Sequence, residues 1–218
     1  ESDLPELLRM GKEHVFVWDP ADNEVHEEDC AIALADELLC EGMTASAVSE
    51  GKISLRTTKA GILQINLQGL RQLNKVPDWT VTSVQNHQAL PSGCIFAAFR
   101  IVPLTTSKDN LDSAIRIARE AREKGNPIFR ILPFQESKVG LIITGSEIFY
   151  KRIPDAFEPI MKQKLAAYPA ELLPTHFCPD DEREILDALM SLKKAGCDLI
   201  LLTGGMSVDP DDVTPLAI

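Results

Sequence analysis

The chain has 218 residues, more than the commonest single domain, and this length favours two domains of modest size. Hydrophobic residues make up 44% and charged residues 25%, and no apolar stretch reaches the roughly 18 residues that span a bilayer. With 22 basic and 33 acidic residues, the formal net charge of -11 repels nucleic-acid phosphates. We therefore expect a soluble protein that binds neither membranes nor nucleic acid.

Cysteine and histidine usage indicates a reducing compartment and argues against a metal centre built on these residues. The five cysteines are odd in number, widely spaced and without a CxxC pair, so they predict neither a disulfide framework nor a zinc site. The four histidines are dispersed without the spacing of metal ligands. The N-terminus lacks a basic region followed by an apolar stretch, so we expect a cytoplasmic protein.

Residues 1–137 are interpreted as a smaller, β-rich α+β domain. Short runs of β-branched and aromatic residues, separated by Gly, Pro and Asn, alternate here with two longer segments of helical periodicity. The expected elements are helices over 3–10, 27–40 and 110–123, and strands over 14–18, 53–57, 61–65, 79–85, 94–102 and 127–134.

Residues 138–218 show a different pattern, in which longer strands and helices alternate. The expected order is a strand over 139–144, a helix over 155–168, a weak strand over 172–178, a helix from Asp180 or Asp181 to Gly196, and a strand over 198–203. This order predicts an α/β domain with three layers and a doubly wound, mostly parallel sheet. We expect Phe157, Ile160, Met161 and Leu165 to face its core, and the last strand to be buried on both faces.

Two polar loops that contain glycine follow strands of this sheet, and the first of them is Thr144-Gly145-Ser146-Glu147. In an open parallel sheet the ligand crevice lies beyond the carboxyl ends of the strands. Gly145 would permit close approach of the backbone, and Ser146 could donate a hydrogen bond. Alone, this turn also fits an ordinary strand-to-helix connection with Ser146 as a cap and Glu147 in solvent.

The second loop begins at Thr203 and has the composition of an anion site. Gly204 and Gly205 offer backbone amides that no side chain obstructs, and Ser207 and Thr214 add hydroxyl groups. The amides at the start of the following helix also favour an anion. The loop therefore predicts a phosphate-binding site.

Three carboxylates, Asp209, Asp211 and Asp212, occur within four residues of the same loop. Their mutual repulsion is costly unless they share a cation, and Mg²⁺ is the natural candidate, with Asp209 and Asp212 as its ligands. Alternatively, Asp209 and Pro210 form a turn, and Asp211 or Asp212 caps the next helix. Both interpretations can hold together.

The run TGGMSVDPDDVTP resembles the signature of the molybdopterin-binding family, which molybdopterin adenylyltransferases and molybdotransferases share. Gly204, Gly205, Ser207, Asp212 and Thr214 occupy the positions of that pattern. The run VGLIITGSEIFYKRIPDAF is similar to the opening strand and TGDE-type turn of the family, with Asp155 at its acidic position. Two departures are Lys151-Arg152, which replaces a glycine, and Met206, where the adenylyltransferases carry Thr.

The resemblance implies a protein of molybdenum cofactor biosynthesis that binds molybdopterin or adenylyl-molybdopterin with Mg²⁺ and, if catalytic, is a nucleotidyl or molybdate transferase. The catalytic residues would be Asp209, Asp212, Glu147 and Asp155. The cofactor-binding residues would be Thr144, Gly145, Ser146, Thr203, Gly204, Gly205, Ser207 and Thr214. Relatives of this fold form dimers or trimers, so a homo-oligomer is expected, and the family fold continues beyond the part present in residues 138–218.

Two alternatives remain. One is a binding or sensor module that has kept the pocket but lost turnover, as Met206 and Lys151-Arg152 suggest. The other is a nucleotide pyrophosphatase resembling the competence-damage-inducible protein family, whose related domain also has a GG loop. In that family the domain opens the protein, whereas here a long N-terminal segment precedes it.

Overall fold

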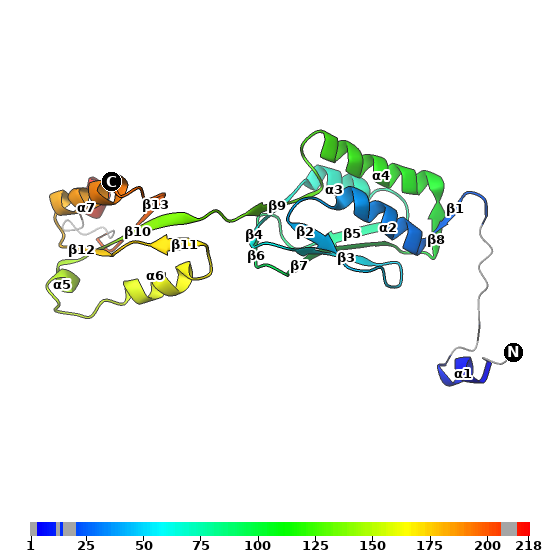
Figure 1. Ribbon diagram of the computed structural model, residues 1–218, viewed down its shortest axis with the longest axis horizontal. Helices are drawn as coiled ribbons and strands as arrows, with labels where there is room; N and C mark the ends of the chain where they lie inside the picture. Colours follow the sequence, from blue (N-terminus) through cyan, green and yellow to red (C-terminus); the bar gives the residue numbers. More distant parts are fainter. Residues whose placement is uncertain (1–3, 12–13, 15–20, 206–212) are drawn as a thin grey trace. The chain divides into compact units, whose positions relative to one another are not determined.

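The computed structural model describes residues 4–11, 14, 21–205 and 213–218. The chain divides into two compact units, Glu1–Pro133 and Phe134–Ile218, and the elements of each are labelled in Figure 1. The N-terminal unit is the larger of the two within this chain, and not the smaller as expected from the sequence. Most of the strand predicted over 14–18 lies outside the described residues.

The N-terminal unit is a mixture of antiparallel sheets and helices. Its sheets have the strand orders β2-β3-β7-β5, β6-β4-β9 and β1-β8, and every pairing in them is antiparallel. The elements are α1 (Leu4–Arg9), β1 (Glu24–His26), α2 (Glu27–Leu38), β2 (Met43–Ala45), β3 (Ile53–Thr57), β4 (Gly61–Ile65), α3 (Leu67–Leu73), β5 (Trp79–Ser83), β6 (Ala89–Leu90), β7 (Ile95–Ile101), β8 (Thr105–Ser107), α4 (Lys108–Glu123) and β9 (Phe129–Pro133).

The core of this unit forms because buried and more exposed side chains alternate along its strands and because its helices are amphipathic. The strands contribute buried aromatic rings, among them Phe96 and Phe129, which meet edge to face at 5.7 Å between centroids. Helices α2 and α4 lie side by side (Figure 1). The Glu37 side chain, only 11% exposed, joins them by accepting hydrogen bonds from Arg119 at 2.7 Å and Arg122 at 2.6 Å.

The C-terminal unit is built on β10 (Ser137–Thr144), which is the centre of a parallel sheet. The other elements are α5 (Ser146–Phe149), α6 (Phe157–Leu165), β11 (Ala170–Leu172), β12 (His176–Cys178), α7 (Glu182–Lys194), β13 (Leu199–Thr203) and α8 (Thr214–Ala217). Strands β11 and β12 pair with successive parts of one edge of β10, and β13 pairs with the other edge. All three pairings are parallel, as predicted.

The two crossovers of this sheet run in opposite directions. From β10 the chain moves to β11 and β12, and from β12 it crosses back over β10 to β13. Because parallel crossovers are right-handed, such a reversal places α6 and α7 on opposite faces, as Figure 1 shows. The predicted three-layer, doubly wound α/β architecture is therefore confirmed.

The core of the C-terminal unit lies between the sheet and α7. Ile185, Ala188 and Leu192 of the helix are buried against Ile142 of β10. Gly140 permits this approach: a Cβ atom on it would lie 2.6 Å from Cδ1 of Leu192. Gly140 thus sets the distance between α7 and the sheet.

Three expectations for this unit were wrong in detail. Phe157 and Ile160 of α6 are 43% and 48% exposed, because the strands of three residues beneath the helix cover only a narrow surface. Within the described residues β13 pairs only with β10, so it is an edge strand and its Leu199 is 47% exposed. The strand predicted over 172–178 is split into β11 and β12 around Pro174, which has no N–H to donate.

Candidate functional site

Three loops meet at the carboxyl end of the parallel sheet. The register pairs Thr144 of β10 with Cys178 of β12, and Ile143 with Thr203 of β13. The three strands therefore end at about the same level, and the loops that follow them lie side by side. This is the position at which ligands bind in open α/β sheets.

Thr144 and Thr214 tie the end of β10 to the start of α8. The Thr144 side chain is almost completely buried, and its hydroxyl lies 3.2 Å from the carbonyl oxygen of Thr203 and 3.0 Å from the hydroxyl of Thr214. Thr214 is itself fully buried. The structure thus brings together two residues predicted to bind the cofactor, and it gives both of them a role in holding the loop.

Gly204 and Gly205 wrap tightly around this pair of hydroxyl groups. Their φ angles are +93° and +56°, in a region that favours glycine. A Cβ atom on Gly204 would lie 2.1 Å from the carbonyl oxygen of Thr144, and one on Gly205 would lie 2.5 Å from Oγ1 of Thr214. Both positions therefore require glycine.

The hydroxyl of Thr203 lies at the start of the same loop. Its Oγ1 atom is buried and makes no hydrogen bond within the described part of the chain. A buried hydroxyl without a partner costs about 1–3 kcal/mol. Among the described side chains of these loops, the Thr203 hydroxyl is a buried polar group without a hydrogen-bond partner.

The first loop is joined to the loop after β12 by two reciprocal hydrogen bonds. The backbone N–H of Ser146 donates to Oδ2 of Asp180 at 2.8 Å, and the backbone N–H of Asp180 donates to Oγ of Ser146 at 3.3 Å. Gly145, at φ +137°, donates its N–H to the carbonyl oxygen of Cys178 at 3.1 Å. These bonds fix the relative position of the first two loops.

Asp180 lies in the candidate site, although the sequence predicted it only as a possible helix cap. The residue that caps α7 is its neighbour Asp181, whose carboxylate accepts from the N–H groups of Arg183 and Glu184. Asp180 is left to point at Ser146 and is half-buried. The sequence does contain a signal for Asp180. Two adjacent aspartates follow a strand, and the next helix needs only one of them as a cap.

The two predicted catalytic residues outside the second loop differ in their surroundings. Glu147 is exposed and lies beside Gly145. Both carboxylate oxygens of Asp155 accept backbone hydrogen bonds, from Phe157 at 2.8 Å and Glu158 at 3.0 Å, and so cap α6. The catalytic roles of Glu147 and Asp155 stay predictions.

A hollow of about 580 Å³ borders α5 and the segment after it, and it is lined by both aromatic and basic side chains. Phe149 and Phe177 contribute partly exposed rings to it. Lys151 and Arg152 are exposed, and the Arg152 guanidinium lies 5.4 Å from the ring centroid of Tyr150. The hollow is thus bounded by the segment that follows Gly145 and by β12.

The remaining predicted site residues, Ser207, Asp209 and Asp212, lie outside the described residues, as does Met206. Across residues 21–205 and the other described segments, no group of three or more His, Cys, Asp or Glu side chains could hold a metal ion. The predicted Mg²⁺ site therefore stays a prediction.

Residues 140–218 match the model of a family described as a probable molybdopterin binding domain. This stretch is a molybdopterin-binding domain of that family. The resemblance seen in the sequence is thereby confirmed. Among the described helices, none combines the length and the apolar character needed to traverse a lipid bilayer.

Part of the chain is also similar to curated proteins. CinA-like proteins of Mycobacterium avium (strain 104) and Mycobacterium leprae (strain TN) are 32% and 31% identical over 78 residues. Each alignment covers 36% of this chain, which spans only 18% of the length of these relatives.

Solved structures with a similar domain include two MoaB proteins. The molybdopterin biosynthesis enzyme MoaB from Thermus thermophilus is 29% identical with a TM-score of 0.36, over 37% of this chain and 52% of that one. The tungsten cofactor synthesizing protein MoaB from Pyrococcus furiosus is 27% identical with a TM-score of 0.37, over 38% and 52%.

Proposed function

We propose that the molybdopterin-binding domain binds a phosphorylated pterin, either molybdopterin or its adenylylated form, at the carboxyl ends of β10, β12 and β13. The observation that carries the proposal is the double-glycine turn held by the buried hydroxyl groups of Thr144 and Thr214. The positive φ angles of Gly204 and Gly205 turn the backbone sharply, and successive backbone amides in such a turn can converge on an anion. The terminal phosphate of the pterin would bind at this turn.

The unpartnered hydroxyl of Thr203 supports the same ligand. A phosphate oxygen at the turn could accept its hydrogen and remove the cost of leaving a buried donor unpaired. The hollow beside α5, with Phe149, Phe177 and Arg152, has the aromatic and cationic side chains that suit a flat ring bearing negative charge. The phosphate of one ligand would thus bind at the double-glycine turn, and its pterin ring would bind in the hollow beside α5.

Transfer of a nucleotidyl or molybdate group is the catalytic form of this proposal. Such chemistry depends mainly on positioning and on neutralising charge, so amides, hydroxyl groups and carboxylates suffice without a nucleophilic side chain. In this proposal Asp209 and Asp212 would be the ligands of Mg²⁺. Ser207 would add a hydroxyl group to the phosphate site. Asp180, held against Ser146, is a further candidate carboxylate at the end of β12.

Isothermal titration of the chain with molybdopterin, with and without MgCl₂, tests the proposal. Saturable binding is expected, and Thr203→Val should weaken it several-fold without lowering stability, because the hydroxyl makes no hydrogen bond within the described residues. Thr80→Val, which changes an exposed threonine of the N-terminal unit, is the matched control. Absence of any binding heat would refute the proposal, and unchanged affinity in Thr203→Val would remove this hydroxyl from the site.

A nucleotide pyrophosphatase of the competence-damage-inducible type is the second candidate. The 32% identity to a CinA-like protein over 78 residues favours it. Incubation with ADP-ribose and MgCl₂ should release AMP if this candidate holds. Pyrophosphate release from ATP that depends on molybdopterin would instead support adenylyl transfer, and binding without either product would support a sensor module.

A further inference from the structure

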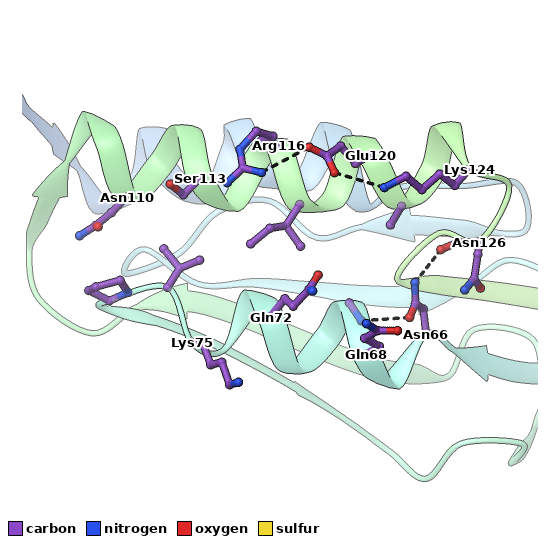
Figure 2. A pocket seen from close by; sticks show the side chains of 15 residues that line it. Asn66, Gln68, Gln72, Lys75, Asn110, Ser113, Arg116, Glu120, Lys124 and Asn126 are labelled. Atoms are coloured by element: carbon purple, nitrogen blue, oxygen red, sulfur yellow. Dashed lines mark hydrogen bonds and ion pairs between the residues drawn. The ribbon is translucent and has the colours of Figure 1, made fainter.

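A polar groove of about 630 Å³ lies between α3 and α4 in the N-terminal unit (Figure 2). Its apolar lining is limited to a few small or aliphatic residues such as Val76, Ile117 and Ala121. All of its lining residues lie within residues 66–126 and are described. The groove therefore belongs to the N-terminal unit alone and does not depend on the proposed function of the other unit.

Two stripes of polar side chains border the groove. On α4 the stripe consists of Asn110, Ser113, Arg116, Glu120 and Lys124, spaced at three or four residues so that they share one helical face. Gln68 and Gln72 of α3, together with Lys75 just after it, form the opposite stripe, as Figure 2 shows. Neighbouring helices ordinarily meet through apolar ridges, whereas these two face each other with hydrogen-bonding groups.

On the α3 side of the groove, polar side chains are available to form hydrogen bonds with a ligand. Within the part of the chain that the structure describes, the side chains of Gln68, Gln72 and Lys75 make no hydrogen bond or ion pair. Each glutamine amide has two donor hydrogens and an acceptor oxygen, which matches the groups of a peptide backbone. These amides can therefore bind a chain laid along α3.

Internal hydrogen bonds mark the two ends of the groove. At one end Nδ2 of Asn66 donates to the carbonyl oxygen of Asn126 at 2.8 Å. At the other end Nδ2 of Asn110 donates to Oγ1 of Thr106 at 3.0 Å and to the Asp78 carboxylate at 3.3 Å. An acidic ligand would thus meet the Asp78 charge at the Asn110 end, whereas Arg116 and Lys124 lie further from that end along the groove.

The lining is cationic although the chain as a whole is acidic. Lys75, Arg116 and Lys124 stand against a single lining carboxylate, Glu120, in a protein of net charge -11. Arg116 and Lys124 each lie 3.3 Å from Glu120, and their hydrogen bonds lower the pKa of this carboxyl. These side chains are largely exposed, so the ion pairs are weak and a ligand carboxylate can compete for both cations.

We propose that this groove binds an extended, acidic peptide segment of a partner protein. No aromatic ring lines the groove, so nucleobases and other flat rings find no stacking surface. Along α4, the stripe from Asn110 to Lys124 covers roughly 21 Å at 1.5 Å per residue, which is the length of about six extended residues. Glutamine amides would bind the peptide backbone, and Lys75, Arg116 and Lys124 would select acidic side chains.

Fluorescence anisotropy with labelled octapeptides tests this inference in the full chain. A peptide that alternates Gly and Glu should bind and weaken as salt is added, whereas the Gly and Gln counterpart should bind at least about tenfold less tightly. Glu120→Gln should tighten binding of the acidic peptide by about two- to fivefold, because it releases Arg116 and Lys124. A purely structural role for Glu120 predicts no such gain.

The double variant Gln72→Ala, Lys75→Glu should weaken binding by at least about tenfold, and Lys52→Glu, an equal charge change at an exposed site of the same unit, should leave it unchanged. The inference is overturned if acidic and neutral peptides bind alike or not at all. It is also overturned if Lys52→Glu weakens binding as much as the double variant. Displacement of the peptide by inorganic phosphate at equal concentration would instead assign the groove to small anions.

Discussion

Gly204→Ala measures how tightly the second loop of the molybdopterin-binding domain is wrapped. The added Cβ would lie 2.1 Å from the carbonyl oxygen of Thr144 and 2.8 Å from its Oγ1, so the loop or the end of β10 must move by roughly 1 Å. A positive φ costs a residue with a side chain about 1–2 kcal/mol, and overpacking adds about 1–3 kcal/mol. The free energy of unfolding of the C-terminal unit should fall by about 2–5 kcal/mol.

Gly196→Ala is the matched control. Gly196 also has a positive φ, +79°, but a Cβ atom there meets nothing within 4 Å. Only the backbone cost of about 1–2 kcal/mol then applies. The difference between the two variants isolates the collision with Thr144.

Urea unfolding can assign the loss to one unit. Both tryptophans, Trp18 and Trp79, come before residue 134, so tryptophan fluorescence reports on the N-terminal unit and circular dichroism on both. Gly204→Ala should shift the dichroism transition of the C-terminal unit to lower urea and leave the fluorescence transition in place. Equal effects of Gly204→Ala and Gly196→Ala would refute the steric argument. Unchanged affinity for molybdopterin in Gly204→Ala would contradict the proposed position of the phosphate at this turn.

Three further predictions concern buried groups. Thr214→Val removes the 3.0 Å contact with Thr144 and should lower the free energy of unfolding by about 1 kcal/mol, which urea titration would detect; no loss would mean that the contact is not stabilising. Leu192→Ala empties a site that is 2% exposed and should cost about 2–5 kcal/mol by the same assay, whereas a loss below about 1 kcal/mol would contradict tight packing. Burial and the nearby Asp29 charge raise the pKa of the Cys30 thiol from 9.0 to about 11, so the unfolded chain releases this proton first. Stability of the N-terminal unit should therefore fall between pH 9.0 and about 11, and less so in Cys30→Ala; identical pH profiles would contradict this.

Long periodic elements were predicted well from the sequence, and short ones were not. Helix α7 follows from the helical spacing of Ile185, Ala188 and Leu192, which are buried in the core. Helix α3 was not predicted, because it has only seven residues and contains a glycine. A short length and a glycine each lower the intrinsic stability of a helix. The local Asn66 cap favours this helix, and so does the close approach of Gly69 to Ile128, a tertiary contact that is not visible in a sequence.

The candidate site shows a similar division. Glycines after parallel strands indicated where two loops would meet, and Gly204 does lie against Thr144. An aspartate before a helix, however, has two uses that sequence alone does not separate. Asp155 caps α6, whereas Asp180 leaves capping to its neighbour and points at Ser146.

Gly140 acts on the candidate site without touching it. It contacts Leu192 near the carboxyl end of α7, whereas Asp180 precedes the amino end of the same helix, roughly 18 Å away for twelve residues at 1.5 Å each. A side chain at position 140 would push the carboxyl end of α7 away from the sheet. The helix would then tilt, and its amino end beside Asp180 would move as well. If the proposed ligand binds at the strand ends, a side chain at position 140 would alter its affinity from within the core, through the tilt of α7.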